Sequence, residues 1–293
     1  MNTLTRRTFL KTGAAAAAAL KLGEHALLAD PLGLPVGLQL YSVRALLPND
    51  YEGTLKKVAA IGYREVEAAG FYGRSAEDVK TAMSAAGLLC VSAHYPLPQL
   101  LKDVDGTLKY AKTLGLSYVI CSSPSVADPS RKQGPLTADD WRWNAEQFNQ
   151  IGKKYKAEGV QFGYHNHTGE FHDFGDGHFG YEILLKDTDP KYVTLEMDCG
   201  WVSASGKSPI DYLTKYPGRF SMLHIKDLKP ASGDHPSERH STVLGKGTVD
   251  YKPIFAAAKK AGIKHYFVEQ EEFDGDTLDE LKQDYAYLHA MHV

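Results

Sequence analysis

Residues 193–226, VTLEMDCGWVSASGKSPIDYLTKYPGRFSMLHIK, contain one complete strand–helix–strand unit of the pattern that repeats along this chain. Apolar and β-branched runs predict strands at Val193–Asp198 and Phe220–Lys226, and the pattern between them predicts a helix near residues 208–216. Two strands joined by a helical crossover pair in parallel. Repeated along a chain, this unit is typical of an α/β protein.

The same alternation extends in both directions and yields eight strand–helix pairs. The predicted strands are Val36–Ser42, Glu65–Ala69, Leu88–Tyr95, Tyr118–Ser122, Gln161–His167, Val193–Asp198, Phe220–Lys226 and His265–Glu271. The predicted helices lie near residues 51–61, 75–86, 100–114, 137–158, 180–186, 208–216, 251–261 and 277–290. Eight such units in roughly 250 residues predict a single-domain (β/α)8 TIM barrel. An open doubly wound sheet is the alternative, but no Gly-x-Gly-x-x-Gly turn follows the first strand.

The N-terminus has the pattern of an export signal. Paired arginines in Thr5-Arg6-Arg7-Thr8-Phe9-Leu10-Lys11 precede the alanine run Ala14–Ala19, as in twin-arginine signal peptides. The apolar stretch is shorter than the roughly 20 residues that span a bilayer. We therefore expect residues 1–29 to be a signal peptide and residues 30–293 to be the barrel domain of an exported, periplasmic protein. An ordinary amphipathic N-terminal helix is the alternative.

Charge and cysteine content limit the partners. Without residues 1–29 the chain has 29 basic and 35 acidic residues, a balance that repels nucleic acid and anionic lipid. We expect no nucleic-acid partner and no membrane contact after removal of the signal. The three cysteines, Cys90, Cys121 and Cys199, form no Cys-x-x-Cys pair and are predicted to be buried free thiols.

Polar side chains stand at the ends of predicted strands five to eight. Because alternate residues of a strand share a face, each of these strands turns a polar pair inward. The pairs are His165 with His167, Glu196 with Asp198, His224 with Lys226, and Glu269 with Glu271. Imidazoles mixed with carboxylates suit Mn, Co, Fe or Zn better than calcium. The alternative is a hydrogen-bonded network without metal.

From Val36 onward the chain resembles the xylose-isomerase-like TIM barrels known as sugar phosphate isomerases/epimerases, which include inosose dehydratases, tagatose-type epimerases and endonuclease IV. The resemblance rests on Gly37–Ser42, Gly62–Glu67, Tyr164–His167, Met197–Trp201, Leu223–Asp227, Gly245–Asp250 and Val268–Glu269. It implies one divalent metal ion (Mn, Co, Fe, Zn or Mg) bound by His165, Asp198, His224 and Glu269. Many epimerases of this family have a glutamate on strand five, where this chain has His165.

A divalent ion bound to a ketone and a neighbouring hydroxyl stabilises the enediolate that proton removal leaves. Returning the proton elsewhere makes the protein an isomerase or epimerase of a small sugar or keto-sugar. Losing a β-substituent makes it a lyase or dehydratase that eliminates water or an aglycone from a 3-keto-sugar. A third hypothesis is a non-catalytic sugar-binding barrel. Endonuclease activity is disfavoured because it requires several metals and a basic groove.

The sequence also suggests candidates for individual roles. The candidate catalytic residues are Glu269, Glu271, Glu67, His167 and Lys226. Lys226 either contacts a substrate oxygen or pairs with a carboxylate. The candidate substrate-binding residues are Gln39 and Tyr41 on the inward face of strand one, His94 at the end of strand three, Trp201 and the loop residue Glu170. Export favours a free or oxidised sugar over a sugar phosphate, and a homo-oligomer is compatible with the sequence.

Overall fold

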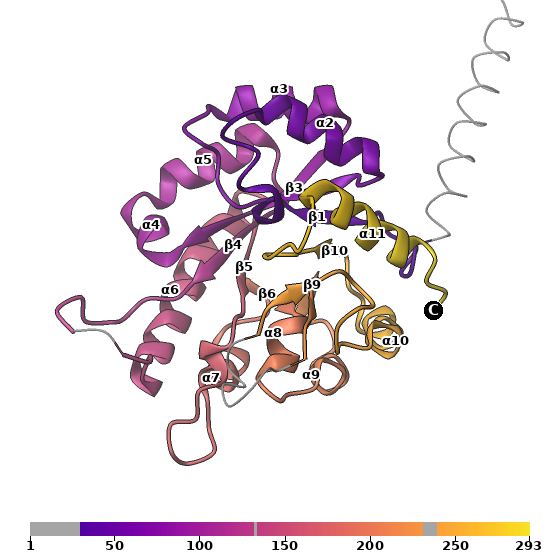
Figure 1. Cartoon of the computed structure of the whole chain (residues 1–293). Coiled ribbons are helices and arrows are strands. Elements are labelled where there is room, and N and C mark those ends of the chain that lie inside the picture. Colours follow the sequence, from indigo (N-terminus) through magenta and orange to yellow (C-terminus); the bar gives the residue numbers. More distant parts are fainter. Residues whose placement is uncertain (1–29, 132–133, 231–238) are drawn as a thin grey trace, which may run out of the picture.

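The computed structural model describes residues 30–131, 134–230 and 239–293, so the predicted signal peptide lies outside the described residues. Eight parallel strands form a closed barrel in the order β1-β10-β7-β6-β5-β4-β3-β2 (Figure 1). The strands are β1 Gly37–Gln39, β2 Glu65–Ala68, β3 Leu89–Pro96, β4 Tyr118–Ser123, β5 Gln161–His165, β6 Val193–Asp198, β7 Phe220–Ile225 and β10 His265–Val268. The predicted TIM barrel is confirmed, and the open doubly wound sheet is wrong.

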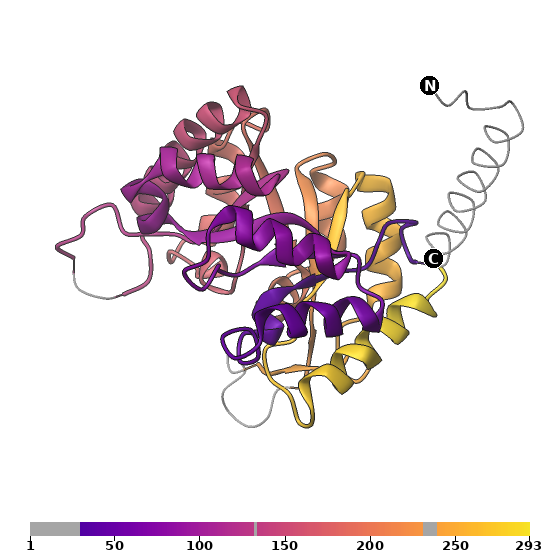
Figure 2. The same cartoon turned by 90° about the horizontal axis from the view of Figure 1, so that it is seen from above.

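Helices surround the barrel, and the last of them packs beside the first described one (Figures 1 and 2). They are α2 Tyr51–Ile61, α3 Ala76–Ala86, α4 Leu97–Lys102, α5 Val104–Leu114, α6 Ala138–Ala157, α7 Gly180–Asp187, α8 Cys199–Ala204, α9 Pro209–Lys215, α10 Tyr251–Ala261 and α11 Thr277–His289. Two short 3-10 helices, η1 Leu40–Val43 and η2 Gly169–Phe171, and the antiparallel pair β8 Asp227–Leu228 with β9 Ser241–Thr242 complete the set.

Local sequence signals explain most helix boundaries. The side chains of Asp50, Ser75 and Thr137 accept hydrogen bonds from backbone N–H groups in the first turns of α2, α3 and α6. Gly87 and Gly115 end α3 and α5 in the left-handed conformation that glycine adopts without strain. The predicted helix over 100–114 is wrong in one respect. It is two helices, because Asp103 takes a non-helical backbone conformation (φ −154°, ψ 73°) and its side chain caps α5.

Several strands end earlier than predicted. The first stops at Gln39, and Tyr41 therefore lies in η1 at the rim, 41% exposed, rather than on the inward face of a strand. The cause is local, since the Gln39 side chain accepts a hydrogen bond from the Tyr41 backbone and starts the 3-10 turn. Strands β5, β7 and β10 likewise end before His167, Lys226 and Glu271, which lie just beyond them.

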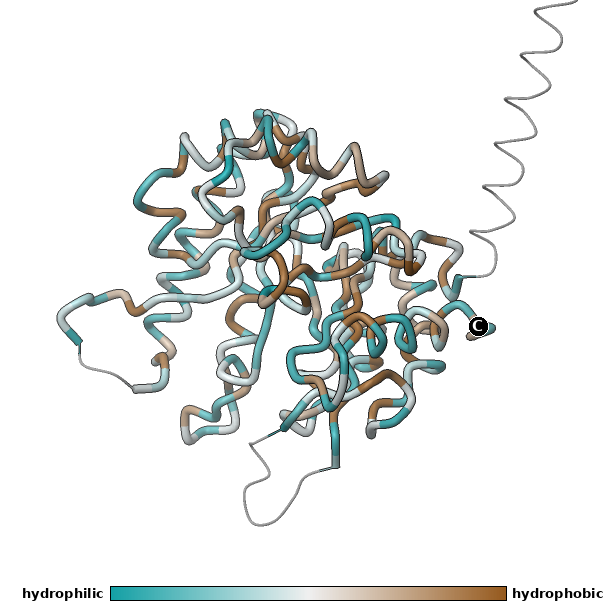
Figure 3. Tube along the Cα trace, turned by 45° about the horizontal axis from the view of Figure 1, so that its top comes forward, coloured by the Kyte–Doolittle hydropathy of each residue, from teal (hydrophilic) through white to brown (hydrophobic). Residues whose placement is uncertain are grey.

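The barrel interior is layered. At its amino-terminal end Glu65 contacts His265, with 2.7 Å between Oε2 and Nδ1. An apolar layer of Val91, Ile120, Met222 and Phe267 fills the middle. Several segments at the centre of the molecule are hydrophobic, and hydrophilic segments are common at its periphery (Figure 3). The polar residues above the apolar layer therefore gather at the carboxyl ends of the strands, where TIM barrels place their active sites.

Candidate active site

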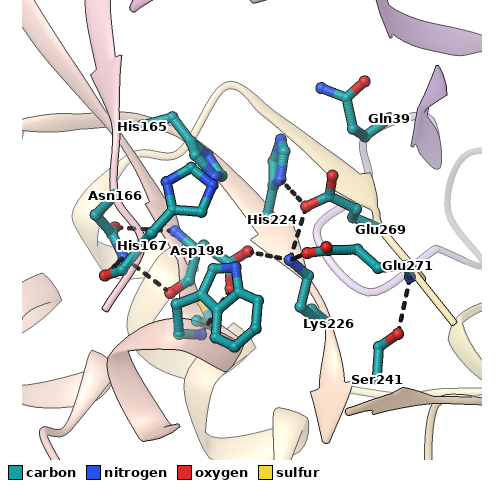
Figure 4. Close-up of polar contacts among 12 residues, drawn as sticks. Gln39, His165, Asn166, His167, Asp198, His224, Lys226, Ser241, Glu269 and Glu271 are labelled. Carbon is teal, nitrogen blue, oxygen red and sulfur yellow. Dashed lines mark hydrogen bonds and ion pairs between the residues drawn. The ribbon is translucent and has the colours of Figure 1, made fainter. Parts of the chain in front are cut away.

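The four predicted metal ligands come together. One potential ligand atom from each of His165, Asp198, His224 and Glu269 lies within 4.8 Å of the others, and all four residues are buried. Asp198 and His224 are on the neighbouring strands β6 and β7, and Glu269 directly follows β10 (Figure 4). Parallel strands bring these ends to one mouth, because their carboxyl ends lie on the same side of the barrel.

A second group of possible ligands lies against the first and shares two of its histidines. It consists of His94, His165, Glu196 and His224, again within 4.8 Å. His94 Nε2 lies 2.7 Å from Glu67 Oε1 and 2.8 Å from Glu196 Oε2. Sequence reasoning placed Glu196 on the inward face but assigned it no role. Glu196 lies between His94 and His165, which come from other strands, so its role depends on the tertiary structure.

Carboxylates hold the two shared histidines. His224 uses both ring nitrogens, with Nδ1 3.0 Å from Glu269 Oε2 and Nε2 2.8 Å from Glu67 Oε1. His165 Nδ1 lies 3.1 Å from Glu196 Oε2. The Glu196 contact fixes the orientation of His165 and leaves its other ring nitrogen for a metal or substrate, whereas the Nδ1 contact of His224 joins it to Glu269, a member of the same possible ligand group. Burial, together with repulsion from His224, lowers the pKa of His165 well below its usual range, as suits a neutral ligand.

Glu67 is a fully buried carboxylate with several hydrogen-bond donors around it. Besides His94 and His224 it accepts hydrogen bonds from Gln39 Nε2 at 2.7 Å and from Ser92 Oγ at 2.5 Å. Burial would raise its pKa, but the charges and hydrogen bonds of His94 and His224 outweigh burial and hold the pKa of Glu67 below its usual range. This environment fits a group that orients His224 better than a base that reaches substrate. Gln39 is also fully buried, and its side-chain amide donates its hydrogen bond to Glu67.

Lys226 pairs with carboxylates rather than pointing into open space. Its Nζ lies 3.0 Å from Asp198 Oδ2 and 2.9 Å from Glu269 Oε2, and it also donates to Glu271 (Figure 4). Burial opposes its charge, yet these three carboxylates together raise the pKa of Lys226 above its usual range. The ammonium also lies 4.4 Å from the ring centroid of Trp201. The ion-pair alternative for Lys226 is therefore observed.

The carboxylates of the site outnumber its basic groups. Five carboxylates, those of Glu67, Glu196, Asp198, Glu269 and Glu271, surround one lysine and three imidazoles. Among the residues that the structure describes, Asp198 Oδ2 and Glu196 Oε1 are buried and accept no hydrogen bond, although Lys226 pairs with the former. Uncompensated buried oxygens are costly. A divalent ion fits this site because it would supply both the missing charge and the missing ligation.

The mouth of the barrel is a polar cavity of about 490 Å³. Its walls include Tyr41, His94, His165, His167, Glu269 and Glu271. Burial raises the pKa of Glu271 above its usual range although Lys226 opposes the shift. Burial and the charge of Lys226 lower the pKa of His167 to about 4, which makes it a neutral group at pH 7. Of the two carboxylates that line the mouth, Glu269 belongs to a possible ligand group and Glu271 belongs to neither group.

Two further candidates occupy enclosed positions. Glu170 is buried, and its Oε1 accepts hydrogen bonds from Tyr164 Oη at 2.6 Å and from the His167 backbone at 2.9 Å. Trp201, in the first turn of α8, donates its backbone N–H to Asp198 at 2.8 Å. Both residues hold groups of the site in place. A direct contact of either with substrate stays a prediction.

The glycine-rich segment Gly245-Lys246-Gly247 has its backbone donors already occupied. Asp227 is buried and accepts hydrogen bonds from the backbone of Leu228, Gly245, Gly247 and Val249 at 2.9 to 3.0 Å. A phosphate at this loop would have to displace a carboxylate from those donors. The loop is therefore internal scaffolding rather than a phosphate cradle.

Fold and site together define a (β/α)8 barrel with a cluster of possible metal ligands at the carboxyl ends of its strands. Comparison with known proteins then places the chain. A profile of the family described as Xylose isomerase-like TIM barrel matches residues 55–291, and the chain belongs to this family. The resemblance found in the sequence is thereby confirmed.

The relatives have enzyme names. The inosose dehydratase of Geobacillus thermodenitrificans is 25% identical over 249 residues, which cover 76% of this chain and 83% of that protein. A sugar phosphate isomerase/epimerase structure from Parabacteroides distasonis is 30% identical with a TM-score of 0.74, covering 86% of this chain and 96% of that one. A second from the same organism is 28% identical with a TM-score of 0.70, covering 87% and 94%.

The N-terminus also matches a known signal. Residues 3–23 match the profile of the twin-arginine translocation pathway signal sequence, which indicates export. In the part of the chain that the structure describes, no helix has the length and apolar character needed to cross a membrane.

Proposed function

We propose that this protein is a divalent-metal-dependent enzyme that removes a proton from the carbon beside a carbonyl group of a small keto-sugar. One observation carries the proposal. The possible ligand set of His165, Asp198, His224 and Glu269 borders a polar cavity that contains one further carboxylate, Glu271. An ion site beside a carboxylate that is not itself a ligand is the arrangement that enolisation needs.

His165, Asp198, His224 and Glu269 would hold the ion, with Glu196 and Glu67 orienting the two imidazoles. When bound, a divalent ion supplies the positive charge that polarises a carbonyl and stabilises the resulting enediolate. Glu271 takes the proton. Its burial favours the neutral acid and so brings its basicity closer to neutral pH.

Two neighbours position Glu271. Lys226 donates to its carboxylate from within the barrel. Ser241 Oγ, in β9, accepts the backbone N–H of Glu271 at 2.8 Å (Figure 4). His167 also lines the cavity, and as a neutral imidazole it can hold or return a proton on the substrate. Tyr41, at the rim, provides a ring against which sugar C–H groups can pack.

Two outcomes follow from the same proton removal. Reprotonation at another carbon or face is isomerisation or epimerisation. Elimination of a β-substituent makes the protein a lyase, and two observations favour that candidate. His165 stands where many epimerases of the family have a second glutamate, and the curated relative from Geobacillus thermodenitrificans is named a dehydratase.

The occupied Gly245–Gly247 backbone and the export signal both favour a substrate without phosphate, such as a free or oxidised sugar processed in the periplasm. The metal is proposed as Mn, Co, Fe, Zn or Mg. A small carbohydrate is accordingly the proposed ligand.

Incubation of the metal-loaded protein with keto-hexoses and 3-keto-glucosides in D2O tests the proposal. Solvent deuterium at carbon with the aglycone retained supports the isomerase or epimerase, and release of water or aglycone supports the lyase. If the sugars stabilise the protein but no proton exchanges at any metal loading, the chain is a sugar-binding barrel and the enzymatic proposal is wrong.

A further inference from the structure

A second cavity opens beside the mouth. Its volume is about 630 Å³, within the range of small-molecule sites, and His167 lines both cavities. Its other walls include Pro124, Leu136, Trp141, Phe171 and Ala204. We call this space the side cavity.

The side cavity lies at the same end of the barrel as the mouth. Pro124 directly follows β4, Phe171 ends η2 after β5, and Ala204 ends α8 after β6. Three consecutive strands thus contribute a wall at their carboxyl ends. Because His167 lines both cavities, it is the residue past which a molecule seated in the mouth would extend into the side cavity.

The chemistry of the two cavities differs. The mouth has carboxylates and imidazoles, whereas the side cavity has two prolines, a leucine and two aromatic rings, and its described lining contains no lysine or arginine. Its one carboxylate, Glu170, directs Oε1 to Tyr164 and to the His167 backbone. The imidazoles of His167 and His172 are the only basic groups in the described lining, so an anionic group would meet no permanent positive charge there, while an apolar group would leave water for a matching surface.

The wall nearest the mouth is preformed. Phe171 packs against Tyr181 and Tyr212 with ring centroids 5.0 and 6.2 Å apart. The hydrogen bonds of Glu170 anchor the segment between His167 and Phe171. A wall held in this way loses little conformational entropy when a ligand binds, which favours specific recognition.

We propose that the side cavity binds an uncharged apolar substituent, such as an aryl aglycone, of a sugar whose ring lies in the mouth. The inference rests on the proposed function, and it narrows the substrate class from free sugars to glycosides. In the lyase reaction the bond between sugar and substituent would then lie beside His167. Specificity would come from Leu136, Phe171 and Ala204, which take no part in the proton transfer.

Calorimetric titration tests the inference without turnover. The full-length, Mn²⁺-loaded protein is titrated with methyl β-D-glucoside and phenyl β-D-glucoside, which share the ring and differ in the substituent. We expect the phenyl compound to bind roughly tenfold more tightly, because burial of the ring removes apolar surface from water. The Leu136→Ala change should reduce this ratio, and Ala204→Leu, which narrows the cavity, should bring it near one.

Leu101→Ala is the matched control, since Leu101 is an exposed leucine of α4 that does not line either cavity, and it should keep the wild-type ratio. Equal affinities of the wild type for the two glucosides would overturn the side-cavity assignment and leave the proposed function intact. Failure of both glucosides to bind would likewise overturn the side-cavity assignment, while the proposed function is tested separately by proton exchange with the keto-sugars.

Discussion

At the scale of single residues, His224 is the centre of the site. It contacts Glu269 with one ring nitrogen and Glu67 with the other, and it belongs to both groups of possible metal ligands. No other residue of these two groups has a carboxylate within 3.0 Å of each ring nitrogen in the described chain. Its replacement should therefore disrupt ion binding wherever in the cluster the ion lies.

His224→Ala should abolish stoichiometric metal binding, because it removes a residue that belongs to both possible ligand groups and that contacts both Glu67 and Glu269. Metal content measured by mass spectrometry after dialysis checks this expectation. His178→Ala is the control, since that imidazole is on the surface and 73% exposed. Equal metal content in the wild type and His224→Ala would exclude His224 as a ligand.

Glu196→Gln should weaken metal binding by about 10- to 100-fold without abolishing it. The amide keeps the shape of the side chain but no longer provides the negative oxygen that holds His165 at 3.1 Å. Competition with a chelator of known affinity measures the change. A complete loss of the metal would instead indicate that Glu196 is a ligand, as the second group of residues allows.

Glu271→Gln should lower the rate of solvent deuterium exchange by roughly 10²- to 10⁴-fold, the range expected for loss of a general base. Metal content should stay at the wild-type level, because Glu271 is outside both ligand groups. Asp274→Asn, an exposed acidic residue paired with Lys229, serves as control. An unchanged exchange rate would assign the base to another group of the mouth, with His167 next in line.

At the scale of elements, the connection after β7 depends on a single carboxylate. Asp227 receives four backbone hydrogen bonds and so joins β8 to the segment 245–249 that leads into α10. Gly247 is required there because a Cβ atom would lie 2.2 Å from Asp227 Oδ1. The connection therefore depends on one acceptor, the Asp227 carboxylate, and on the absence of a side chain at Gly247.

Gly247→Ala should destabilise the fold by roughly 1 to 3 kcal/mol, since the methyl group must displace a buried, hydrogen-bonded carboxylate. Urea unfolding followed by circular dichroism gives the difference in the free energy of unfolding. At Gly169, an added Cβ meets nothing within 4 Å, so Gly169→Ala is the matched control and should change stability little. Similar losses in both variants would contradict the role assigned to Asp227.

At the scale of the whole molecule, α11 closes the ring of helices and contributes a buried acid. Asp284 accepts the backbone N–H of Leu244 at 2.7 Å, while its Oδ2 has no hydrogen-bond partner among the described residues. Burial raises the pKa of Asp284 from 3.8 to about 7, and the neighbouring Glu280 adds to the shift. The folded state therefore retains a proton that the unfolded chain releases at lower pH.

Because the folded state retains this proton, the free energy of unfolding should fall as the pH rises. The contribution of Asp284 to the free energy of unfolding should be greatest below about pH 4, decline between about pH 4 and 7, and stay low above pH 7. Asp284→Asn, which cannot ionise, should match the wild type at pH 4 and exceed it by a few kcal/mol at pH 8. Denaturant unfolding across this range provides the test. Equal stability of Asp284→Asn and the wild type at both pH values would show that burial does not raise the pKa of Asp284.

Patterns among neighbouring residues predict the barrel, its eight strands and the inward polar pairs at the ends of strands five to eight, while the choice of four metal ligands among these pairs came from the family resemblance. Strand–helix alternation and the two-residue period of strands are properties of neighbouring residues, so His165, Asp198, His224 and Glu269 could be placed on one face without coordinates. The same locality explains the errors. Strand ends such as that at Gln39 depend on a single side-chain contact, which periodicity does not encode.

Which polar groups contact one another depends on the tertiary structure. Glu67 meets His224 across 157 residues, and Glu196 meets His94 across 102. Closure of the barrel also set Lys226 among three carboxylates and placed the side cavity beside His167. These contacts depend on how far each strand is shifted against the next and on how side chains fill the interior, and both are set by the packing of all eight strands together.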